Sequence, residues 1–497
     1  MEIVLGPILR LRAVEPEPAR WRVSVLVVVT GAEAPPLSWT SSARETSAAA
    51  PVRLAEHGGR TVWSIELAVT RGAAPVEVTY RLGGAGSWRF TVPATHERPR
   101  MIYNTCNGFS SLKAAKSVRD PFGLWVEVAA VHAQTPYHLM MMGGDQVYAD
   151  PLWETIEELV DWSHSGSFIA DVVGMSGALA EKVDRFYFEL YVKRWAQPQV
   201  AAMLASIPTV MMWDDHDIFD GWGSYPDSRQ RSPVYQGIFK AAQRWFCVFQ
   251  LHRGSATATD EFIAPTPSLS YAHRIDDLAI VALDLRSERS SSRVMSPASW
   301  DAVLRWIDGQ EGLRHLLLMT SIPVVYPDLG AIEDALGFLP GRQELEDDLR
   351  DHWASRAHQG ERLRLVHRLL DFARVRGTRV TILSGDVHVG AMGLIESTRD
   401  EAPQSISQLI SSAIVHPSAQ AIFIYALDRL FDAGGSIDRG IEVRMLPFPG
   451  SRRRLLAARN WLSLEPDLAW DTSRKRMWAN WHVEGEVEPF TKVIHSQ

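Results

Sequence analysis

The chain has 497 residues, of which 46% are hydrophobic and 22% are charged, and its formal net charge is -8. This balance is that of ordinary globular proteins, so it favours neither an intrinsically disordered nor a fibrous protein. The acidic excess argues against a dedicated nucleic-acid-binding protein, because binding to a phosphate backbone requires a basic surface. Since one hydrophobic core rarely exceeds roughly 250–300 residues, we expect two domains.

The only cysteines are Cys106 and Cys247, which could form at most one disulfide, so a reducing compartment is compatible with the sequence. The first residues carry no basic segment before a short apolar run, and no apolar run approaches the ~20 residues of a membrane helix. We therefore expect a cytoplasmic protein with no signal peptide, twin-arginine signal or transmembrane segment.

Residues 1–97 are rich in short β-branched or alternating runs that turns containing Gly, Pro and Ala separate. Such a pattern is typical of antiparallel strands. The runs lie at residues 8–14, 21–29, 61–69, 75–82 and 87–92. They predict an N-terminal all-β sandwich of the immunoglobulin or fibronectin kind, ending near residue 97.

After residue 97, apolar strand-like runs alternate with amphipathic helical patterns. This alternation predicts a layered α/β domain that we assign to residues 98–497. The strand-like runs lie at residues 102–106, 137–142, 208–213, 278–283, 314–320 and 379–384. Residues 430–497 form a β-rich C-terminal extension that we expect to lengthen a sheet or to cover its edge.

Four of these runs end in acidic residues or histidine. The groups are GGDQVY with Asp145 and Tyr148, WDDHD with Asp214 to Asp217, LDLR with Asp284 and Arg286, and SGDVH with Asp386 and His388. In open α/β sheets, ligands bind outside the carboxyl ends of the strands, because loops there can direct side chains from several strands to one place. The repeated placement therefore predicts a functional site.

The residue types favour metal ions as the ligands of this site. Asp386 and His388 are two residues apart, so in extended backbone both side chains leave the same face and can serve neighbouring metals. Packing the carboxylates of DDHD together without cations would be unfavourable. Taken singly, each motif has an ordinary alternative: a turn-forming aspartate, a surface turn, or an exposed acidic loop with a helix cap.

Together with the cysteine at the end of the first strand of this region, these motifs resemble the alkaline phosphatase D group of calcineurin-like metallophosphatases. The resemblance covers roughly residues 98–430, and the preceding sandwich is similar to the N-terminal domain that the family often carries. Two departures from ordinary calcineurin-like enzymes stand out in the chain. Their opening aspartate-x-histidine is replaced by NTCNG, and their asparagine before histidine by Asp215.

The resemblance implies a ferric ion held by Cys106, Asp145, Tyr148 and His388, with calcium bound by Asp386 and Asp215. A trivalent ion favours the thiolate and the phenolate, whose free pKa values of ~8.5 and ~10 would otherwise leave them protonated. Without the resemblance, Cys106 is more simply read as a buried core thiol.

The expected activity is metal-assisted hydrolysis of a small-molecule phosphoester, with no nucleic-acid or membrane partner. His216 would protonate the leaving oxygen, and Arg286 would either hold a phosphate oxygen or form a structural salt bridge with Asp284. The motifs do not distinguish a monoester from a diester. A non-catalytic binding protein on a decayed metallophosphatase scaffold is the alternative.

Overall fold

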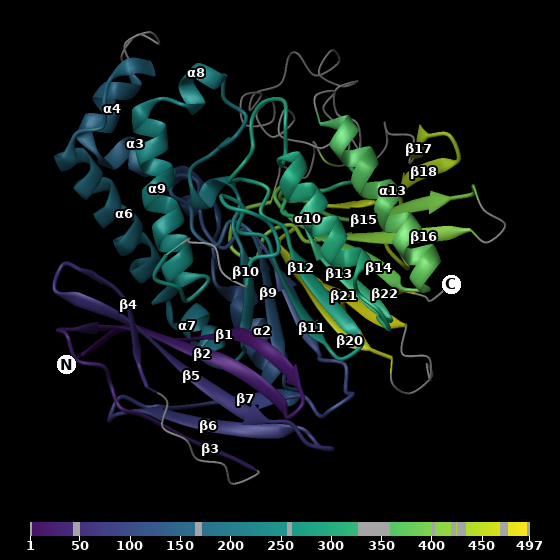
Figure 1. Ribbon diagram of the computed structural model, residues 1–497, viewed down its shortest axis with the longest axis horizontal. Helices are drawn as coiled ribbons and strands as arrows, with labels where there is room; N and C mark the ends of the chain where they lie inside the picture. The colour runs from purple at the N-terminus through teal and green to yellow at the C-terminus, as the bar shows by residue number, and fades with distance from the viewer. Residues whose placement is uncertain are drawn as a thin grey trace.

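The structure is a computed structural model that describes most of the chain. The described residues are 2–42, 50–164, 171–255, 261–326, 358–399, 403–418, 424, 434–467 and 476–494. They form two large sheets and one small sheet, with helices against both large sheets (Figure 1). None of the helices in these ranges combines the length and the apolar character that a membrane span needs.

The N-terminal part contains strands only. They are β1 (Ile3–Pro16), β2 (Ala19–Thr30), β3 (Leu37–Ser41), β4 (Val52–His57), β5 (Arg60–Thr70), β6 (Val76–Leu82) and β7 (Ser87–Val92). All five predicted strands are therefore confirmed, and β3 and β4 are additional. β6 shows why these segments form strands: its hydrophobic side chains Val76, Val78, Tyr80 and Leu82 alternate with exposed or half-buried ones, so one face is buried.

These strands belong to two different sheets. β1, β2, β5 and β4 are neighbours at one end of a ten-stranded sheet, whereas β3, β6 and β7 form a three-stranded sheet of their own. Buried side chains from both sheets lie in one hydrophobic cluster, and Figure 1 shows one sheet above the other at the N-terminal end. β1 also pairs in parallel with β10 (Thr209–Met212), so the N-terminal strands share a sheet with the region after residue 97. The two-domain division at that residue stays a prediction.

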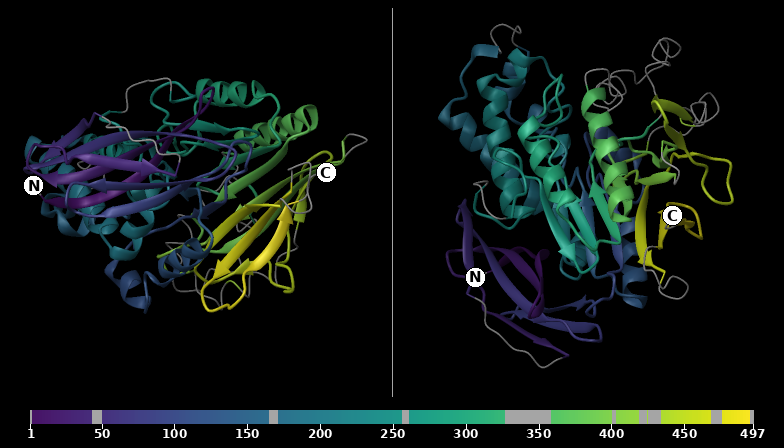
Figure 2. Two further views of the ribbon diagram at one scale, coloured as in Figure 1. Left: turned by 90° about the horizontal axis from the view of Figure 1, so that it is seen from below. Right: turned by 45° about the vertical axis from the view of Figure 1, so that its right-hand side comes forward.

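The rest of the ten-stranded sheet comes from the middle and the end of the chain. Its order is β22-β21-β20-β8-β9-β10-β1-β2-β5-β4. The strands not yet bounded are β8 (Met101–Asn104), β9 (Leu139–Gly143), β20 (Asn460–Pro466), β21 (Met477–Val483) and β22 (Phe490–Ile494). β20 pairs with β8, so this part of the tail extends the sheet, and the N-terminal and C-terminal strands lie at opposite ends of the molecule (Figure 2, left).

The second large sheet has nine strands. Its main order is β11-β12-β13-β14-β16-β15-β18-β17, and β19 pairs with β15. The strands are β11 (Tyr271–Ile275), β12 (Leu278–Ala282), β13 (His315–Met319), β14 (Arg379–Ser384), β15 (Gly390–Ser397), β16 (Gln404–Ile410), β17 (Gly434–Asp438), β18 (Ile441–Met445) and β19 (Leu455–Leu456). All six strand-like runs predicted between residues 102 and 384 are thus strands of the two sheets.

The two large sheets pack against each other, and the alternation of side chains along β12 shows this directly. Leu278, Ile280 and Ala282 belong to the hydrophobic cluster shared with the ten-stranded sheet. Ala279 and Val281 belong to a second cluster on the opposite face. Because successive side chains of a strand point to opposite faces, one face of the nine-stranded sheet meets the other sheet and the second face meets helices.

Helices α10 (Pro297–Asp308) and α13 (Gln359–Arg376) contribute to that second cluster and run along the nine-stranded sheet (Figure 1). Helices α2 (Gly123–Gln134), α6 (Gly177–Trp195) and α7 (Pro198–Leu204) belong to the side of the ten-stranded sheet, where α6 and α7 contact β1. The remaining elements are α1 (Leu112–Ser117), α3 (Leu152–Thr155), α4 (Glu157–Ser163), η1 (Asp215–Asp217), α8 (Asp227–Gln230) and α9 (Pro233–Phe249). The core is thus layered, as the sequence predicts.

A buried ionic network ties β1 to the segment that precedes β11. Glu261 forms ion pairs with Arg10, whose side chain is fully buried, and with Arg12 and Arg253 at 3.3 Å and 2.8 Å. Burial alone would raise the pKa of Glu261, but Arg10 and Arg12 outweigh it and lower that pKa to about 2. A carboxylate with a depressed pKa stabilises the fold above its ordinary pKa and loses that effect as the pH falls towards 2.

We expect Glu261→Gln to lower the free energy of unfolding at neutral pH by about 3–5 kcal/mol, because three arginines lose their shared counterion in a buried place. Glu189→Gln is the matched control, since its partner Arg60 and Glu189 itself are 31% and 49% exposed; it should change stability by at most about 1 kcal/mol. Denaturant titration of both variants measures the difference. Equal stability losses would contradict a special role for the buried network.

Candidate metal centre

The predicted site residues follow the carboxyl ends of parallel strands in both large sheets. β8, β9 and β10 run parallel in one sheet, and β12, β13, β14 and β16 run parallel in the other. Cys106 follows β8, Asp145 follows β9, Asp214 follows β10 and Asp386 follows β14. Because the sheets are stacked, these strand ends bring side chains from segments up to 280 residues apart to one place.

The backbone at these positions is unusual. Cys106, Asp145, Asp386 and His388 have φ values of 54°, 55°, 68° and 51°, in the left-handed region that non-glycine residues rarely adopt. They are four of the seven such non-glycine residues in the described part of the chain. Backbone strain of this kind persists where the surrounding structure enforces it, and it concentrates at functional sites.

Glycines beside these residues allow the loops to approach closely. A Cβ atom on Gly144, whose φ is 107°, would lie 2.8 Å from the Cβ of Asp214. A Cβ on Gly385 would lie 2.4 Å from the side chain of Thr105. The glycines that precede Asp145 and Asp386 in the GGD and SGD motifs are therefore needed for the loops to meet.

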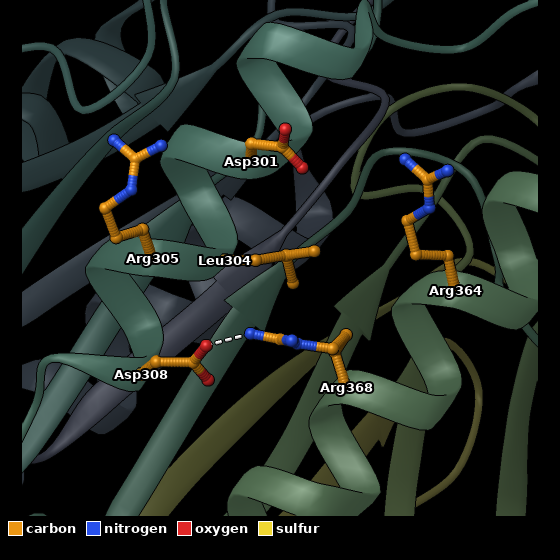
Figure 3. Close-up of a pocket in the computed structure, with 6 residues that line it drawn as sticks. All are labelled: Asp301, Leu304, Arg305, Asp308, Arg364 and Arg368. Carbon is orange, nitrogen blue, oxygen red and sulfur yellow. Dashed lines mark hydrogen bonds and ion pairs between the residues drawn. The ribbon is translucent and has the colours of Figure 1, made fainter.

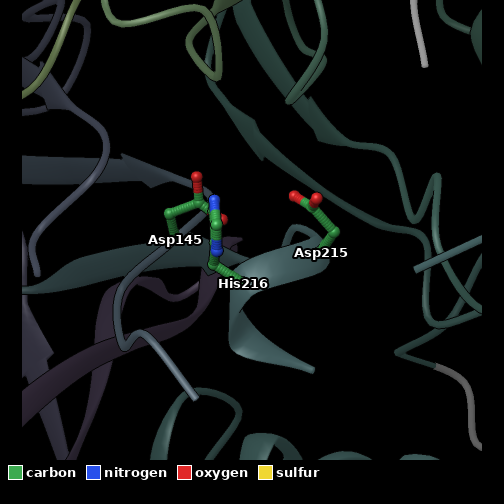
Figure 4. Close-up of side chains that lie close together, drawn as sticks. All are labelled: Asp145, Asp215 and His216. Atoms are coloured by element: carbon green, nitrogen blue, oxygen red, sulfur yellow. The ribbon is translucent and has the colours of Figure 1, made fainter. Parts of the chain in front are cut away.

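Four carboxylates converge at the centre. Asp145, Asp214, Asp215 and Asp386 each place an oxygen within 4.8 Å of the others, and Asp145, Asp215 and His216 form a second such group. Figure 4 shows Asp215 and His216 on the same short helix, η1, beside Asp145. Asp145 is 1% exposed, and its Oδ1 has no hydrogen-bond partner among the described residues. Burial raises the pKa of Asp145 well above its usual value, and Asp214 and Asp215 add to that rise against the opposing effect of His216.

The remaining predicted ligands adjoin Asp145 on one side. The Cys106 thiol lies 3.5 Å from Asp145 Oδ2, and the Tyr148 hydroxyl lies 3.2 Å from His388 Nε2. Cys106 and Tyr148 are buried together with Ala413. Burial raises the pKa of both the thiol and the phenol, so without a cation both stay protonated. Asp145 thus belongs both to the carboxylate group and to a cysteine, tyrosine and histidine group.

His216 is oriented by a residue that the sequence did not single out. Its Nδ1 lies 2.9 Å from Asp150 Oδ2, while the other oxygen of Asp150 accepts a hydrogen bond from the backbone N–H of Asp220. Burial disfavours the charged imidazole, but Asp150 and Asp215 outweigh it and raise the pKa of His216 well above its ordinary value. The ring therefore carries a proton beside the carboxylates.

Arg286 is fully buried and forms other ion pairs than the sequence suggested. Its guanidinium donates to Asp214 and, at 3.2 Å, to Asp215, and lies 4.0 Å from Asp386. The salt bridge that we considered between Arg286 and Asp284 does not form. Asp284 instead accepts hydrogen bonds from the Trp213 indole and from backbone N–H groups, including that of Arg286 itself. Arg286 therefore fixes the carboxylates of the candidate centre.

Asp217 is the one acid of DDHD that faces away from the centre. Its carboxylate accepts hydrogen bonds from the backbone N–H groups of Gln146, Val147 and Asp214 and from the Gln250 side chain. These bonds hold the GGDQVY loop against the DDHD loop. Asp217 is therefore a structural residue, and not one of the converging carboxylates that the motif suggested.

Asp150 and His416 are functional candidates that the sequence did not select, and Asp214 was named within the WDDHD motif but not assigned as a metal ligand. The His416 ring stacks on His388 at 4.0 Å between ring centroids and on Tyr148 at 5.1 Å. His416 Nδ1 lies 2.9 Å from the Pro417 carbonyl, so it donates there, and Nε2 accepts from Ser110 at 3.1 Å. A histidine soon after the end of β16 was a usable signal, because the other site residues also follow strand ends.

A groove of about 460 Å³ lies elsewhere, between α10 and α13 (Figure 3). It is lined by Asp301, Leu304, Arg305, Asp308, Arg364 and Arg368, and Arg368 pairs with Asp308. None of the predicted site residues lines it, so it is separate from the strand ends that carry the centre.

These features define a class of protein: a layered α/β fold whose strand ends gather carboxylate, imidazole, thiol and phenol donors suited to more than one metal ion. The chain matches the family model of the PhoD related phosphatases over residues 74–339 and 337–431. It belongs to that family, as the sequence motifs indicated.

A curated relative is the uncharacterized protein YGR266W of Saccharomyces cerevisiae. The two chains are 29% identical over 468 residues, which cover 79% of this chain and 66% of the yeast protein. This chain therefore spans less than two thirds of the length of that relative.

Two solved structures share the fold. The structure of PhoD superposes with a TM-score of 0.59 at 12% identity, covering 99% of this chain and 90% of that one. The purple acid phosphatase PPD1 from yellow lupin (Lupinus luteus) seeds superposes with a TM-score of 0.52 at 10% identity. This match covers 98% of this chain and 73% of the lupin chain. At such low identities these matches establish the mixed α/β fold alone.

Two Asp→Asn variants distinguish a carboxylate that binds metal from a carboxylate that has a structural role. In metal-free protein, Asp217→Asn should lower the free energy of unfolding by about 1–3 kcal/mol, because its amide cannot accept all the hydrogen bonds that Asp217 accepts. Asp145→Asn should leave that stability unchanged or raise it, since it removes a buried charge that lacks a full set of partners. Denaturant titrations with chelator, and metal analysis without it, test this. Asp145→Asn protein that retains all its metal would contradict the assignment.

Proposed function

We propose that this protein hydrolyses phosphoric esters, using a centre of two or more metal ions that activates water. The observation that carries the proposal is the position of Asp145. It is buried, one of its oxygens has no hydrogen-bond partner among the described residues, and it stands between the converging carboxylates and the Cys106, Tyr148 and His388 group. A carboxylate so placed is suited to bridge two cations.

The donor set supports a ferric ion on one side and calcium on the other. Cys106, Asp145, Tyr148 and His388 would hold the iron, because thiolate, phenolate and imidazole together suit a transition metal. Asp215 and Asp386 would hold calcium, which prefers carboxylate oxygens, and Asp214 lies close enough to join them. Binding there would release the protons that burial keeps on Cys106 and Tyr148.

The chain's own residues supply the other parts of hydrolysis. When bound, the cations would polarise the phosphoryl oxygens and lower the pKa of a coordinated water. His216, which Asp150 holds through Nδ1, would protonate the leaving oxygen through its other nitrogen. Arg286 fixes Asp214 and Asp215, so we propose that it acts by positioning these carboxylates.

The substrate that we propose is a small-molecule phosphoester, either a monoester or a diester. In this proposal, residues 1–97 form a β-sandwich that supports the catalytic domain. The catalytic domain comprises residues 98–497, and residues 430–497 are its C-terminal extension. None of the converging groups comes from β1 to β7, which fits a supporting role.

We expect the purified protein to release 4-nitrophenol from 4-nitrophenyl phosphate or from its bis-ester, and to lose this activity on chelation in proportion to the metal removed. Restoring the metal should restore turnover. His388→Ala should abolish turnover without unfolding the chain, because it removes a ligand at the edge of the core. Metal-loaded, folded protein that turns over neither ester would instead favour the non-catalytic binding protein.

The iron assignment predicts a coloured protein, since thiolate and phenolate bound to ferric iron absorb visible light. Dithionite should bleach the band. Tyr148→Phe keeps the ring that stacks on His216 at 4.4 Å but removes the phenolate, so it should shift or weaken the band; Cys106→Ser should weaken iron retention. A visible spectrum and iron analysis of the three proteins measure this. Colourless, iron-free and fully active protein would contradict iron while leaving the hydrolase intact.

A further inference from the structure

A cationic side chain lies beside the candidate centre without a counterion. Arg194 is in the last turn of α6, and the guanidinium carbon lies 5.5 Å from the centroid of the Phe109 ring. Among the described residues Arg194 has neither a hydrogen bond nor an ion pair through its side chain. By contrast Arg286, which is also at the centre, forms ion pairs with three carboxylates.

A hydrogen bond holds the end of α6 close to a loop that carries predicted metal ligands. Trp195, the next residue, is fully buried, and its indole N–H donates to the backbone carbonyl of Gln146 at 3.3 Å. Gln146 follows Asp145 and precedes Tyr148 by two positions. The helix end is thereby attached to the loop of the candidate iron ligands.

Phe109, on which Arg194 stacks, continues the loop that begins at Cys106. Its neighbour Ser110 bonds to His416, whose ring stacks on His388, and a Cβ on Gly108 would lie 2.3 Å from the Tyr148 ring. Arg194 therefore occupies the rim of the centre on the side of Cys106, Tyr148 and His388. It forms no ion pair with the converging carboxylates, of which Asp214, Asp215 and Asp386 pair with Arg286 instead.

We propose that Arg194 binds a second anionic group of the substrate, a carboxylate or a further phosphoryl group in addition to the ester that is hydrolysed. The inference rests on the proposed phosphoester hydrolase and names its substrate class. A half-buried guanidinium on an aromatic face has lost part of its hydration. An anionic ligand can replace the lost water by accepting two parallel charge-assisted hydrogen bonds from the guanidinium N–H groups. Burial also lowers the pKa of Arg194, as expected for a cation that lacks a counterion.

The competing explanation is that Arg194 only stabilises the helix, because cations are favourable near a helix C-terminus. The chain provides a control for this. Lys193 lies in the same last turn and is exposed, so it shares the helix-end position but not the contact with Phe109. A ligand-binding role should be found in Arg194 alone.

The test measures binding of non-hydrolysable phosphonates to the metal-loaded protein by calorimetry. Alkylphosphonates of increasing chain length are compared with matched ligands that end in a carboxylate or in a second phosphonate. At one chain length, a second anion should tighten binding to the unaltered protein about tenfold, as one charge-assisted pair can. Arg194→Gln should remove this gain and leave the plain alkylphosphonate within about twofold; Lys193→Gln should change neither. The better of the two anions identifies the second group.

Each other result overturns the proposal. An unaltered protein that prefers no second anion, an Arg194→Gln variant that keeps the preference, or equal losses in both variants would each contradict it. Because the experiment measures ligand binding and not turnover, its failure can be told apart from the failure of the proposed hydrolase function. Protein that hydrolyses 4-nitrophenyl phosphate but shows no Arg194-dependent preference refutes this inference alone, whereas protein that binds the phosphonates but hydrolyses neither aryl ester refutes the proposed function.

Discussion

The structure around the strand ends depends on one electrostatic constraint: four carboxylates with little exposed surface lie within a small volume. Like charges at such separations repel, and burial adds a desolvation penalty for each. Arg286 and the protonated ring of His216 offset part of this repulsion. Burial raises the pKa of Asp145 well above its usual value, and the neighbouring Asp214 and Asp215 add to that rise. The metal binding that we propose would supply free energy that the protein lacks without cations, and this would offset the cost of the left-handed backbone at four of the predicted ligands.

A rigid frame holds these strained loops in register. Asp217 collects three backbone N–H groups from the GGDQVY and DDHD loops, and Arg286 joins the second sheet to Asp214 and Asp215. Loop backbones also bond directly, as where the N–H groups of Val415 and His416 donate to the Cys106 carbonyl. The stacked sheets provide the fixed ends of all these loops. Precise placement of ligands thus comes from residues that bind no metal themselves.

The sequence located half of the strands of the described structure, and it also located the candidate site residues that the structure brings together, because both depend on local pattern. The apolar runs are buried strands, and acids or histidine follow them at the carboxyl ends, where the stacked parallel strands bring them together. The features that the sequence could not predict depend on residues that are distant in the chain. Asp150 has a role only because His216 lies against it, and Arg286 pairs with Asp214, which follows a strand of the other large sheet, and not with Asp284 two positions before it. Likewise, β1 reads as a sandwich strand, yet it also hydrogen-bonds to β10. No periodicity in β1 encodes that neighbour.

The pairing of β1 with β10 connects the N-terminal strands to the candidate centre through a few direct contacts. β1 lies beside β10, whose carboxyl end carries Asp214, Asp215 and His216, and Thr209 at the start of β10 donates to the Leu9 carbonyl at 2.8 Å. The Arg10 and Glu261 network then holds β1 to the segment before β11, the edge strand of the second sheet. β1 therefore contacts both of the large sheets whose strand ends carry the candidate centre. A site formed by two sheets needs contacts that hold the sheets together, because a shift of one sheet against the other would separate Asp145 and Asp215 from Asp386.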